Sequence, residues 1–301
     1  MSKRDLRKLA TEDKNLATAD LDTRPALEIA RIVSAEDAKV APAVERALPE
    51  IAGAIDAIAE SLSRGGRLIY VGAGTSGRIA ALDASECPPT FNADPGMVQY
   101  VIAGGERALG RAAEHSEDSR EQGRRDLARR KPTPKDVVVG ISASGRTPYT
   151  IAALEYARSR GARTVAVTSN PASPLAAAAD ITIAAEVGPE VVAGSTRMKA
   201  GTAQKMILNM LSTGAFTRLG YVYGNLMVNV NLKNEKLLKR GISVLERAAQ
   251  VDRMTAERAL NNAGRSVPAA LVMLKAGVSR AEAKRRLRAA RGNVRRAITG
   301  M

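Results

Sequence analysis

Two short segments rich in glycine and hydroxyl side chains have the composition of phosphate-binding loops. The first reads GAGTSGR at 72–78 and the second reads SASGRTP at 142–148. Each follows a β-branched run and precedes a helical pattern, and a helix start attracts an anion by about 0.3–1 kcal/mol. The two loops together predict a phosphate site formed by Gly74, Thr75, Ser76, Arg78, Ser142, Ser144, Gly145, Arg146 and Thr147.

The first loop also fits the G-x-G-x-x-G fingerprint of dinucleotide-binding proteins. That fingerprint requires an acidic residue about 20 positions later, at the end of the second strand. Here a proline-rich insertion fills 83–95, and the strand end offers only Glu106. The hydroxyls and the arginine suit a phosphate monoester better, and no nucleotide P-loop motif is present. A tight turn, or a helix merely capped by Ser144 or Thr147, is the structural alternative.

A third cluster, GSTRMKAGTAQK at 194–205, begins a long predicted helix. Cations in the first turn of a helix oppose its dipole, so an anion close to them is expected. We therefore add Ser195, Arg197 and Lys199 to the predicted binding residues. A capped helix with a basic first turn is the alternative interpretation.

The composition excludes several kinds of site. The 301 residues include one cysteine and one histidine, so a disulfide within the chain or a Cys- or His-rich metal site is not expected. The N-terminal segment has no apolar core of a signal peptide, and no apolar run is long enough to cross a membrane. We expect a cytoplasmic protein.

The formal charge of +15 raises the question of a nucleic-acid partner. The last 57 residues hold 13 Lys/Arg against 4 Asp/Glu, yet no aromatic residue follows Tyr223. Without aromatic side chains, base stacking is not available to this segment. We interpret the charges as a solvated helix face and expect no specific nucleic acid. A weak, salt-sensitive acidic partner is the alternative.

The elements that position these loops follow from periodicity. β-type runs at 67–71, 98–103, 136–141, 164–168 and 181–184 alternate with helical segments such as 106–117 and 148–160. This pattern predicts an α/β fold with a doubly wound parallel five-stranded sheet and helices on both faces. Ligands bind such folds at the carboxyl ends of the strands.

Three regions are expected along the chain. Residues 1–57 form an N-terminal helical region, with one helical pattern over 40–62, and residues 58–221 form the sheet domain. Residues 222–301 form C-terminal helices, with one over 225–239. A small basic bundle follows, with helices near 243–250, 255–263 and 279–290.

Two acidic residues in unusual surroundings are candidates for proton transfer. Glu86 lies in the predicted loop ended by prolines, and Glu117 lies at the end of a predicted helix. On residue type and position alone, each fits a surface carboxylate better than a catalytic acid.

Three motifs stand out for their combination of unusual residues: DASECPPT at 83–90, EDSR at 117–120 and GSTRMKAGT at 194–202. With these motifs the chain resembles the N-acetylmuramic acid 6-phosphate etherases, bacterial lyases of the sugar isomerase (SIS) fold that act in peptidoglycan recycling. The resemblance extends from TE at 11–12 to GNLMV at 224–228, with Asn229 where an aspartate is expected. It implies that Glu86 and Glu117 are the two active-site acids, with Glu86 in the proton-donor position. It also implies a homodimer, with the site near the subunit interface, and no need for a metal or an organic cofactor.

The implied reaction cleaves the D-lactyl ether of this amino sugar. A base removes the C2 hydrogen of the open-chain sugar, lactate leaves from C3 with a proton from an acid, and water adds. The products are N-acetylglucosamine 6-phosphate and D-lactate, and Arg197 or Lys199 would hold the lactyl carboxylate. The alternatives are a sugar-phosphate isomerase of the same fold and a non-catalytic regulator like the glucokinase regulatory protein. Such regulators have two SIS domains, whereas this chain has room for one.

Overall fold

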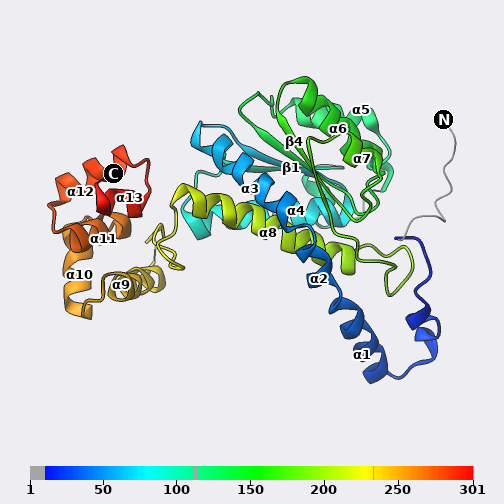
Figure 1. Cartoon of the computed structure of the whole chain (residues 1–301), viewed down its shortest axis with the longest axis horizontal. Coiled ribbons are helices and arrows are strands. Elements are labelled where there is room, and N and C mark those ends of the chain that lie inside the picture. Colours follow the sequence, from blue (N-terminus) through cyan, green and yellow to red (C-terminus); the bar gives the residue numbers. More distant parts are fainter. Residues whose placement is uncertain (1–10, 112–113, 233, 301) are drawn as a thin grey trace. The chain divides into compact units, whose positions relative to one another are not determined.

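A computed structural model gives the structure of residues 11–111, 114–232 and 234–300 (Figure 1). The chain divides into two compact units. The first contains the described residues up to Ala84 together with Gly96–Ser212, and the second contains Ser85–Pro95 and the described residues from Thr213 onward. The boundaries of these two units differ from those of the expected regions 1–57, 58–221 and 222–301. Those regions stay a prediction.

A five-stranded parallel sheet forms the centre of the first unit. The strand order is β2-β1-β3-β4-β5, and all pairs are parallel. The strands are β1 (Leu68–Gly72), β2 (Val98–Ile102), β3 (Val137–Ile141), β4 (Arg163–Thr168) and β5 (Ile181–Ala184). Every residue of β1 and β3 is buried, as expected for central strands covered on both faces. The predicted doubly wound α/β fold is confirmed.

Helices pack on the faces of this sheet, and α3, α6 and α7 contact its strands directly. The helices from the N-terminal segment to the end of the sheet region are α1 (Ala26–Asp37), α2 (Val40–Glu45), α3 (Leu48–Ser63), α4 (Gly74–Phe91), α5 (Arg120–Ala128), α6 (Pro148–Ser159), α7 (Pro174–Ala177) and α8 (Lys199–Leu219). Helix α6 packs against β1, β3 and β4, and α5 packs against α6. Their face contains Ile69, Val71 and Val138. Because side chains alternate along a strand, Leu68 and Tyr70 point to the opposite face.

The helix expected over 106–117 does not form, and this prediction was wrong. The described part of the segment contains two 3-10 turns, Glu106–Leu109 and Glu114–Ser116. Arg78 on α4 donates hydrogen bonds to the carbonyl oxygens of Ala108, Leu109 and Arg111. These are acceptors that a continuous α-helix would use for its own N–H groups.

The proline-rich insertion is helical up to Phe91 rather than a loop throughout, which corrects a second expectation. Helix α4 continues to Phe91 and contains Pro88 and Pro89. The two prolines lie within the last four residues of the helix. The damage that a proline does to a helix is therefore confined to its end. Glu86 lies on this helix and is exposed.

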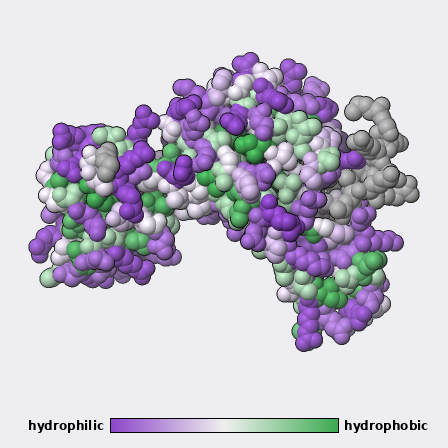
Figure 2. All heavy atoms as spheres, viewed as in Figure 1, coloured by the Kyte–Doolittle hydropathy of each residue, from purple (hydrophilic) through white to green (hydrophobic). Residues whose placement is uncertain are grey.

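The second unit contains a helical bundle built around one apolar helix. Its helices are α9 (Glu235–Ala249), α10 (Arg253–Asn262), α11 (Val267–Ala276), α12 (Arg280–Ala289) and α13 (Val294–Thr299). Helix α11 packs against the other four, and five of its residues are buried. Figure 2 shows hydrophilic side chains over much of the visible face of this unit.

The expected C-terminal bundle is confirmed, although two of its helices, α11 and α13, were not predicted. Helix α9 begins at Glu235, where the Asn234 side chain accepts a hydrogen bond from the Leu237 N–H at 2.9 Å. The start expected at residue 225 was therefore wrong. Among the described residues, no helix has the length and apolarity needed to cross a membrane.

Candidate active site

One cavity of about 300 Å³ lies where the chain leaves β1 and β3 at their carboxyl ends. We call it the cradle. Its walls carry hydroxyl groups, glycines and two carboxylates. The residues that line it are Glu12, Ala73, Gly74, Thr75, Ser76, Arg78, Glu117, Ser142, Ala143, Ser144, Thr147, Gly194 and Thr196.

The first wall is the turn from β1 into α4. The first intrahelical bond runs from Gly77 N to Ala73 O at 3.2 Å. The preceding N–H groups in this turn therefore have no acceptor within the helix, which is the arrangement that binds anions. Gly74 has a φ of +52°, and a Cβ placed there would lie 2.8 Å from Glu117 Oε1. The absence of a side chain at Gly74 leaves room for the Glu117 carboxylate.

The second wall is the loop between β3 and α6. Ser142 Oγ lies 2.8 Å from Thr147 Oγ1 and accepts a hydrogen bond from Gly145 N at 3.1 Å. Gly145 has a φ of +65°, and a Cβ there would lie 2.2 Å from Ser173 Oγ. Ser144 Oγ accepts a hydrogen bond from Arg146 N at 3.2 Å. These contacts hold the loop in one conformation and present its hydroxyls to the cavity.

The backbone of Glu117 is attached to the same wall. Tyr149 lies in the first turn of α6, and its N–H donates a hydrogen bond to the Glu117 carbonyl oxygen at 3.0 Å. A free N–H at a helix start thus fixes the position of a residue that is 32 places earlier in the sequence. Glu117 is thus attached to the β3–α6 loop through its backbone and lies beside the β1–α4 turn with its carboxylate. We call these two segments the phosphate-type loops.

Two carboxylates of the protein itself lie at the start of α8, and one of them pairs with Lys199. The carboxylate of Glu190 is fully buried and accepts hydrogen bonds from the N–H groups of Lys199 and Ala200 at 2.9 and 3.0 Å. Lys199 is 1% exposed, and its ammonium pairs with Glu36 at 2.6 Å. Lys199 is therefore not available to a ligand in this conformation, contrary to the expectation from sequence. The anion expected beside this helix start is supplied by the protein itself.

The charged state of Glu36 is strongly favoured. Burial of this carboxyl opposes ionisation, but hydrogen bonds from Lys199 and Lys39 outweigh that effect and lower its pKa to about 2. The Lys39 bond is 2.5 Å long. This buried ion pair joins the end of α1 to the start of α8.

The structure brings together part of the predicted binding set. Gly74, Thr75, Ser76, Arg78, Ser142, Ser144 and Thr147 line the cradle, whereas Gly145, Arg146, Ser195, Arg197 and Lys199 do not. Although Arg78 lines the cavity, three backbone carbonyls of the 108–111 segment occupy its guanidinium. Thr196 and Glu12 were missed, although both belong to motifs already noted in the sequence.

Of the two candidate acids, only Glu117 lines the cradle. Glu86 lies 12 residues after Gly74 on α4, and a helix rises 1.5 Å per residue, so the two are about 18 Å apart along the axis. One turn before Glu86, Asp83 is 4% exposed and accepts a hydrogen bond from Tyr70 Oη at 2.8 Å. Burial raises the pKa of Asp83, although hydrogen bonds favour its charged form. Asp83 therefore ties α4 to the sheet.

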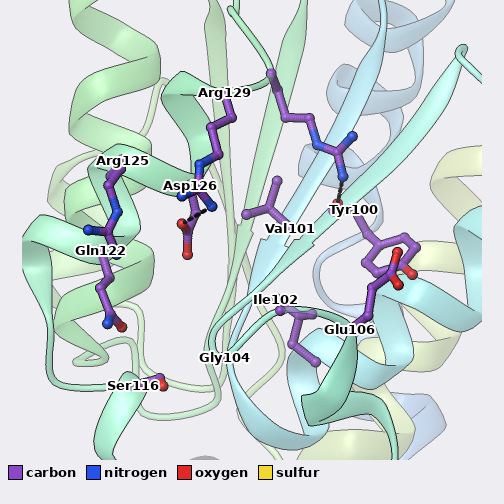
Figure 3. Close-up of a pocket in the computed structure, with 12 residues that line it drawn as sticks. Tyr100, Val101, Ile102, Gly104, Glu106, Ser116, Gln122, Arg125, Asp126 and Arg129 are labelled. Carbon is purple, nitrogen blue, oxygen red and sulfur yellow. Dashed lines mark hydrogen bonds and ion pairs between the residues drawn. The ribbon is translucent and has the colours of Figure 1, made fainter.

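A second cavity of about 520 Å³ lies between β2 and α5 (Figure 3). Arg125 and Gln122 reach into it from α5, and Tyr100 and Val101 form the opposite side. Ser116 lines this cavity, whereas the next residue, Glu117, lines the cradle. The two cavities are therefore lined by consecutive residues of the chain. No residue of this cavity had been predicted as part of a site. Among the described residues, no cluster of histidine, cysteine and acidic side chains could hold a metal.

Comparison with known proteins assigns the family. The family model "Glucokinase regulatory protein N-terminal SIS domain" matches residues 50–158, and the SIS domain model matches residues 128–214. An N-acetylmuramic acid 6-phosphate etherase from Symbiobacterium thermophilum is 59% identical over 274 residues, which is 91% of each chain. The chain belongs to the N-acetylmuramic acid 6-phosphate etherase family.

Other relatives agree with this assignment. The etherase from Edwardsiella ictaluri is 53% identical over 96% of this chain and 97% of its own. Among solved structures, a phosphoheptose isomerase from Francisella tularensis has a TM-score of 0.51 and 20% identity, and covers 64% of this chain and all of its own. At that identity the likeness shows the SIS fold and nothing more. The family resemblance expected from the sequence motifs is confirmed over nearly the full length of this etherase-family chain.

Proposed function

We propose that this chain is a carbon–oxygen lyase that converts N-acetylmuramic acid 6-phosphate into N-acetylglucosamine 6-phosphate and D-lactate. The observation that carries the proposal is a 300 Å³ cradle with Glu117 among phosphate-type loops, in a chain 59% identical to a named etherase. The reaction belongs to peptidoglycan recycling, and we place it in the cytoplasm.

The chemistry explains why carboxylates are needed. An ether resists direct hydrolysis because an alkoxide is a poor leaving group. In the open-chain sugar the C1 aldehyde acidifies the C2 hydrogen, so a carboxylate can remove it. Lactate then leaves from C3 when an acid protonates the ether oxygen, and water adds to the unsaturated aldehyde. Each positioned proton transfer contributes about 10²–10⁴-fold to the rate.

The residues of the cradle suit separate parts of such a substrate. The N–H groups at the start of α4, with Ser142, Ser144 and Thr147, would hold the 6-phosphate. Glu117 would transfer a proton at the sugar. Arg197 is exposed and remains our candidate for binding the lactyl carboxylate, because the pairing of Lys199 with Glu36 excludes the other candidate.

The second acid is proposed to come from a homodimer with its site near the subunit interface. Glu86 is exposed on α4 and is not a wall of the cradle of its own chain. An exposed carboxylate on a helix is suited to complete a site in a neighbouring subunit. The resemblance of the DASECPPT motif implies that Glu86 is the proton donor.

The test is to incubate the purified chain with N-acetylmuramic acid 6-phosphate and to measure D-lactate and the sugar product. We expect D-lactate and N-acetylglucosamine 6-phosphate in equal amounts. An aldose–ketose product without lactate would indicate an isomerase. Binding without any product would indicate a sugar-phosphate sensor.

A further inference from the structure

The cradle has a second carboxylate that comes from the N-terminal segment rather than from the acid motifs. Glu12 lines the cavity together with Glu117. Its Oε2 lies 3.4 Å from where a Cβ at Gly194 would be, which places the carboxylate beside the wall that precedes α8.

The segment that contains Glu12 is fastened along this wall. The Thr11 carbonyl oxygen accepts a hydrogen bond from Gly194 N at 3.3 Å, and Thr11 is 3% exposed. Further along, Asn15 Nδ2 donates to Pro189 O at 3.4 Å, and Thr18 Oγ1 donates to Val191 O at 2.8 Å. Three hydrogen bonds over eight residues therefore fix the backbone around Glu12 against residues 189–194, which we call the strip.

Buried charges fix the strip in turn. Glu190 lies within it and accepts two N–H groups from the first turn of α8. Lys199 in the same turn pairs with Glu36 inside the protein. Glu12 is therefore placed by an anchored backbone, although its own side chain is exposed.

The Glu12 carboxylate makes no hydrogen bond or ion pair with another residue of the described chain. An ionised carboxylate only accepts hydrogen bonds and repels a phosphate close to it. Its partner in the cradle is therefore a neutral donor of the ligand, away from the phosphate. A sugar phosphate offers such donors in its hydroxyl groups and in the N–H of an acetamido group.

We propose that Glu12 is a sugar-binding residue that accepts a hydrogen bond from a hydroxyl or amide N–H of the substrate. The proposal rests on the proposed function, because it requires a sugar phosphate in the cradle. The two carboxylates of the cradle then have different tasks. Glu117, beside Gly74, acts at the reacting carbons, and Glu12, beside Gly194, recognises the polar groups of the sugar.

The test compares Glu12→Ala and Glu12→Gln with the control Asp13→Asn, an exposed acid on the same segment that does not line the cradle. Calorimetric titrations use N-acetylglucosamine 6-phosphate and, separately, inorganic phosphate. We expect Glu12→Ala to weaken sugar-phosphate binding about 10- to 100-fold, the effect of losing a hydrogen bond to a charged group. We expect unchanged or tighter binding of inorganic phosphate, which has no sugar donor.

Glu12→Gln keeps an acceptor oxygen and should lose less affinity than Glu12→Ala, and Asp13→Asn should match the wild type. Equal losses for both ligands would show a structural role for Glu12, and no loss would show no contact. Either result overturns the inference. Binding is read independently of turnover, so a chain that binds the sugar phosphate with this pattern but releases no lactate overturns only the proposed lyase. A wild-type chain without affinity for the sugar phosphate overturns both.

Discussion

The backbone of Glu117 is held by α6, and its carboxylate lies beside a glycine. The N–H of Tyr149 holds its carbonyl, and Gly74 leaves space for its carboxylate beside the start of α4. A carboxylate held there is positioned to act on a phosphate-anchored sugar without being the group that binds the phosphate.

At this scale we predict that Glu117→Gln lowers lactate release by about 10²–10⁴-fold, because the amide cannot transfer the proton. Binding of N-acetylglucosamine 6-phosphate should stay within a few-fold of the wild type. The matched control is Glu121→Gln, an exposed acid in the first turn of α5 that does not line the cradle. A Glu117→Gln enzyme with near-normal turnover would show that the proton transfer has been assigned to the wrong residue.

The buried ion pair gives a prediction about pH. Because the pKa of Glu36 is lowered from 4.5 to about 2, its stabilisation is complete above about pH 4.5 and is lost as the pH falls toward 2. Glu36→Gln should therefore have a lower free energy of unfolding at pH 7, and should lose less of it between pH 5 and 3. Urea unfolding measures this, with Glu28→Gln on the same helix as control. Parallel pH curves for Glu36→Gln and wild type would contradict the assignment.

The role of a residue could be predicted where it depends on neighbouring residues in the sequence. It could not be predicted where it depends on a partner far away in the sequence. The hydroxyl-rich loops at Thr75 and Ser142 could be recognised because each follows a strand and begins a helix. Lys199 was misjudged because its partner, Glu36, lies 163 residues away in the sequence. Arg78 was predicted to be a binding residue and lines the cradle, but its hydrogen bonds to backbone carbonyls were not predicted, since those carbonyls belong to a loop about 30 residues later.

At the scale of elements, the five strands were predicted to within one residue at each end, because β-branched runs in a buried parallel sheet have a strong local pattern. The helices were less certain. The segment 106–117 has helical periodicity, but the side chain of Arg78 takes up its carbonyls. The opposite error occurred in α4, where Pro88 and Pro89 suggested a loop although the helix continues to Phe91.

The loop before α6 gives a prediction for one element. Gly145→Ala places a Cβ 2.2 Å from Ser173 Oγ at a φ of +65°. The left-handed backbone alone costs about 1–2 kcal/mol for a residue other than glycine. We therefore expect a lower free energy of unfolding and weaker binding of inorganic phosphate, measured by urea unfolding and calorimetry.

The control for this variant is Gly110→Ala, at a glycine with a φ of −107° and open space around its Cβ position. It should leave stability and binding nearly unchanged. A Gly145→Ala protein as stable as the Gly110→Ala protein would show that the loop adapts without cost.

At the scale of the whole molecule, the proposed homodimer places Glu86 of one subunit at the cradle of the other. A mixture of refolded Glu86→Gln and Glu117→Gln subunits tests this arrangement. Half of the dimers would then be mixed, and each would have one intact site, so about a quarter of wild-type activity should return. Each variant alone should be inactive. No recovery in verified mixed dimers would show that both acids act within one subunit.

The oligomer could not be derived from the residues of one chain, since an interface has no local pattern like that of a strand or a loop. The sequence motifs did assign the family, because they combine two unusual segments, DASECPPT and GSTRMKAGT. The composition also predicted the basic C-terminal bundle. Its central helix α11 was not predicted, because its apolar residues do not lie on one face of the helix.

The most direct test of the mechanism is the reaction in D₂O, with the C2 position of the sugar product analysed by NMR. Removal of the C2 hydrogen, elimination of lactate and addition of water require that C2 be protonated again from solvent. This mechanism predicts one deuterium at C2 of N-acetylglucosamine 6-phosphate for each D-lactate released. D-lactate release with full retention of the original C2 hydrogen would contradict it.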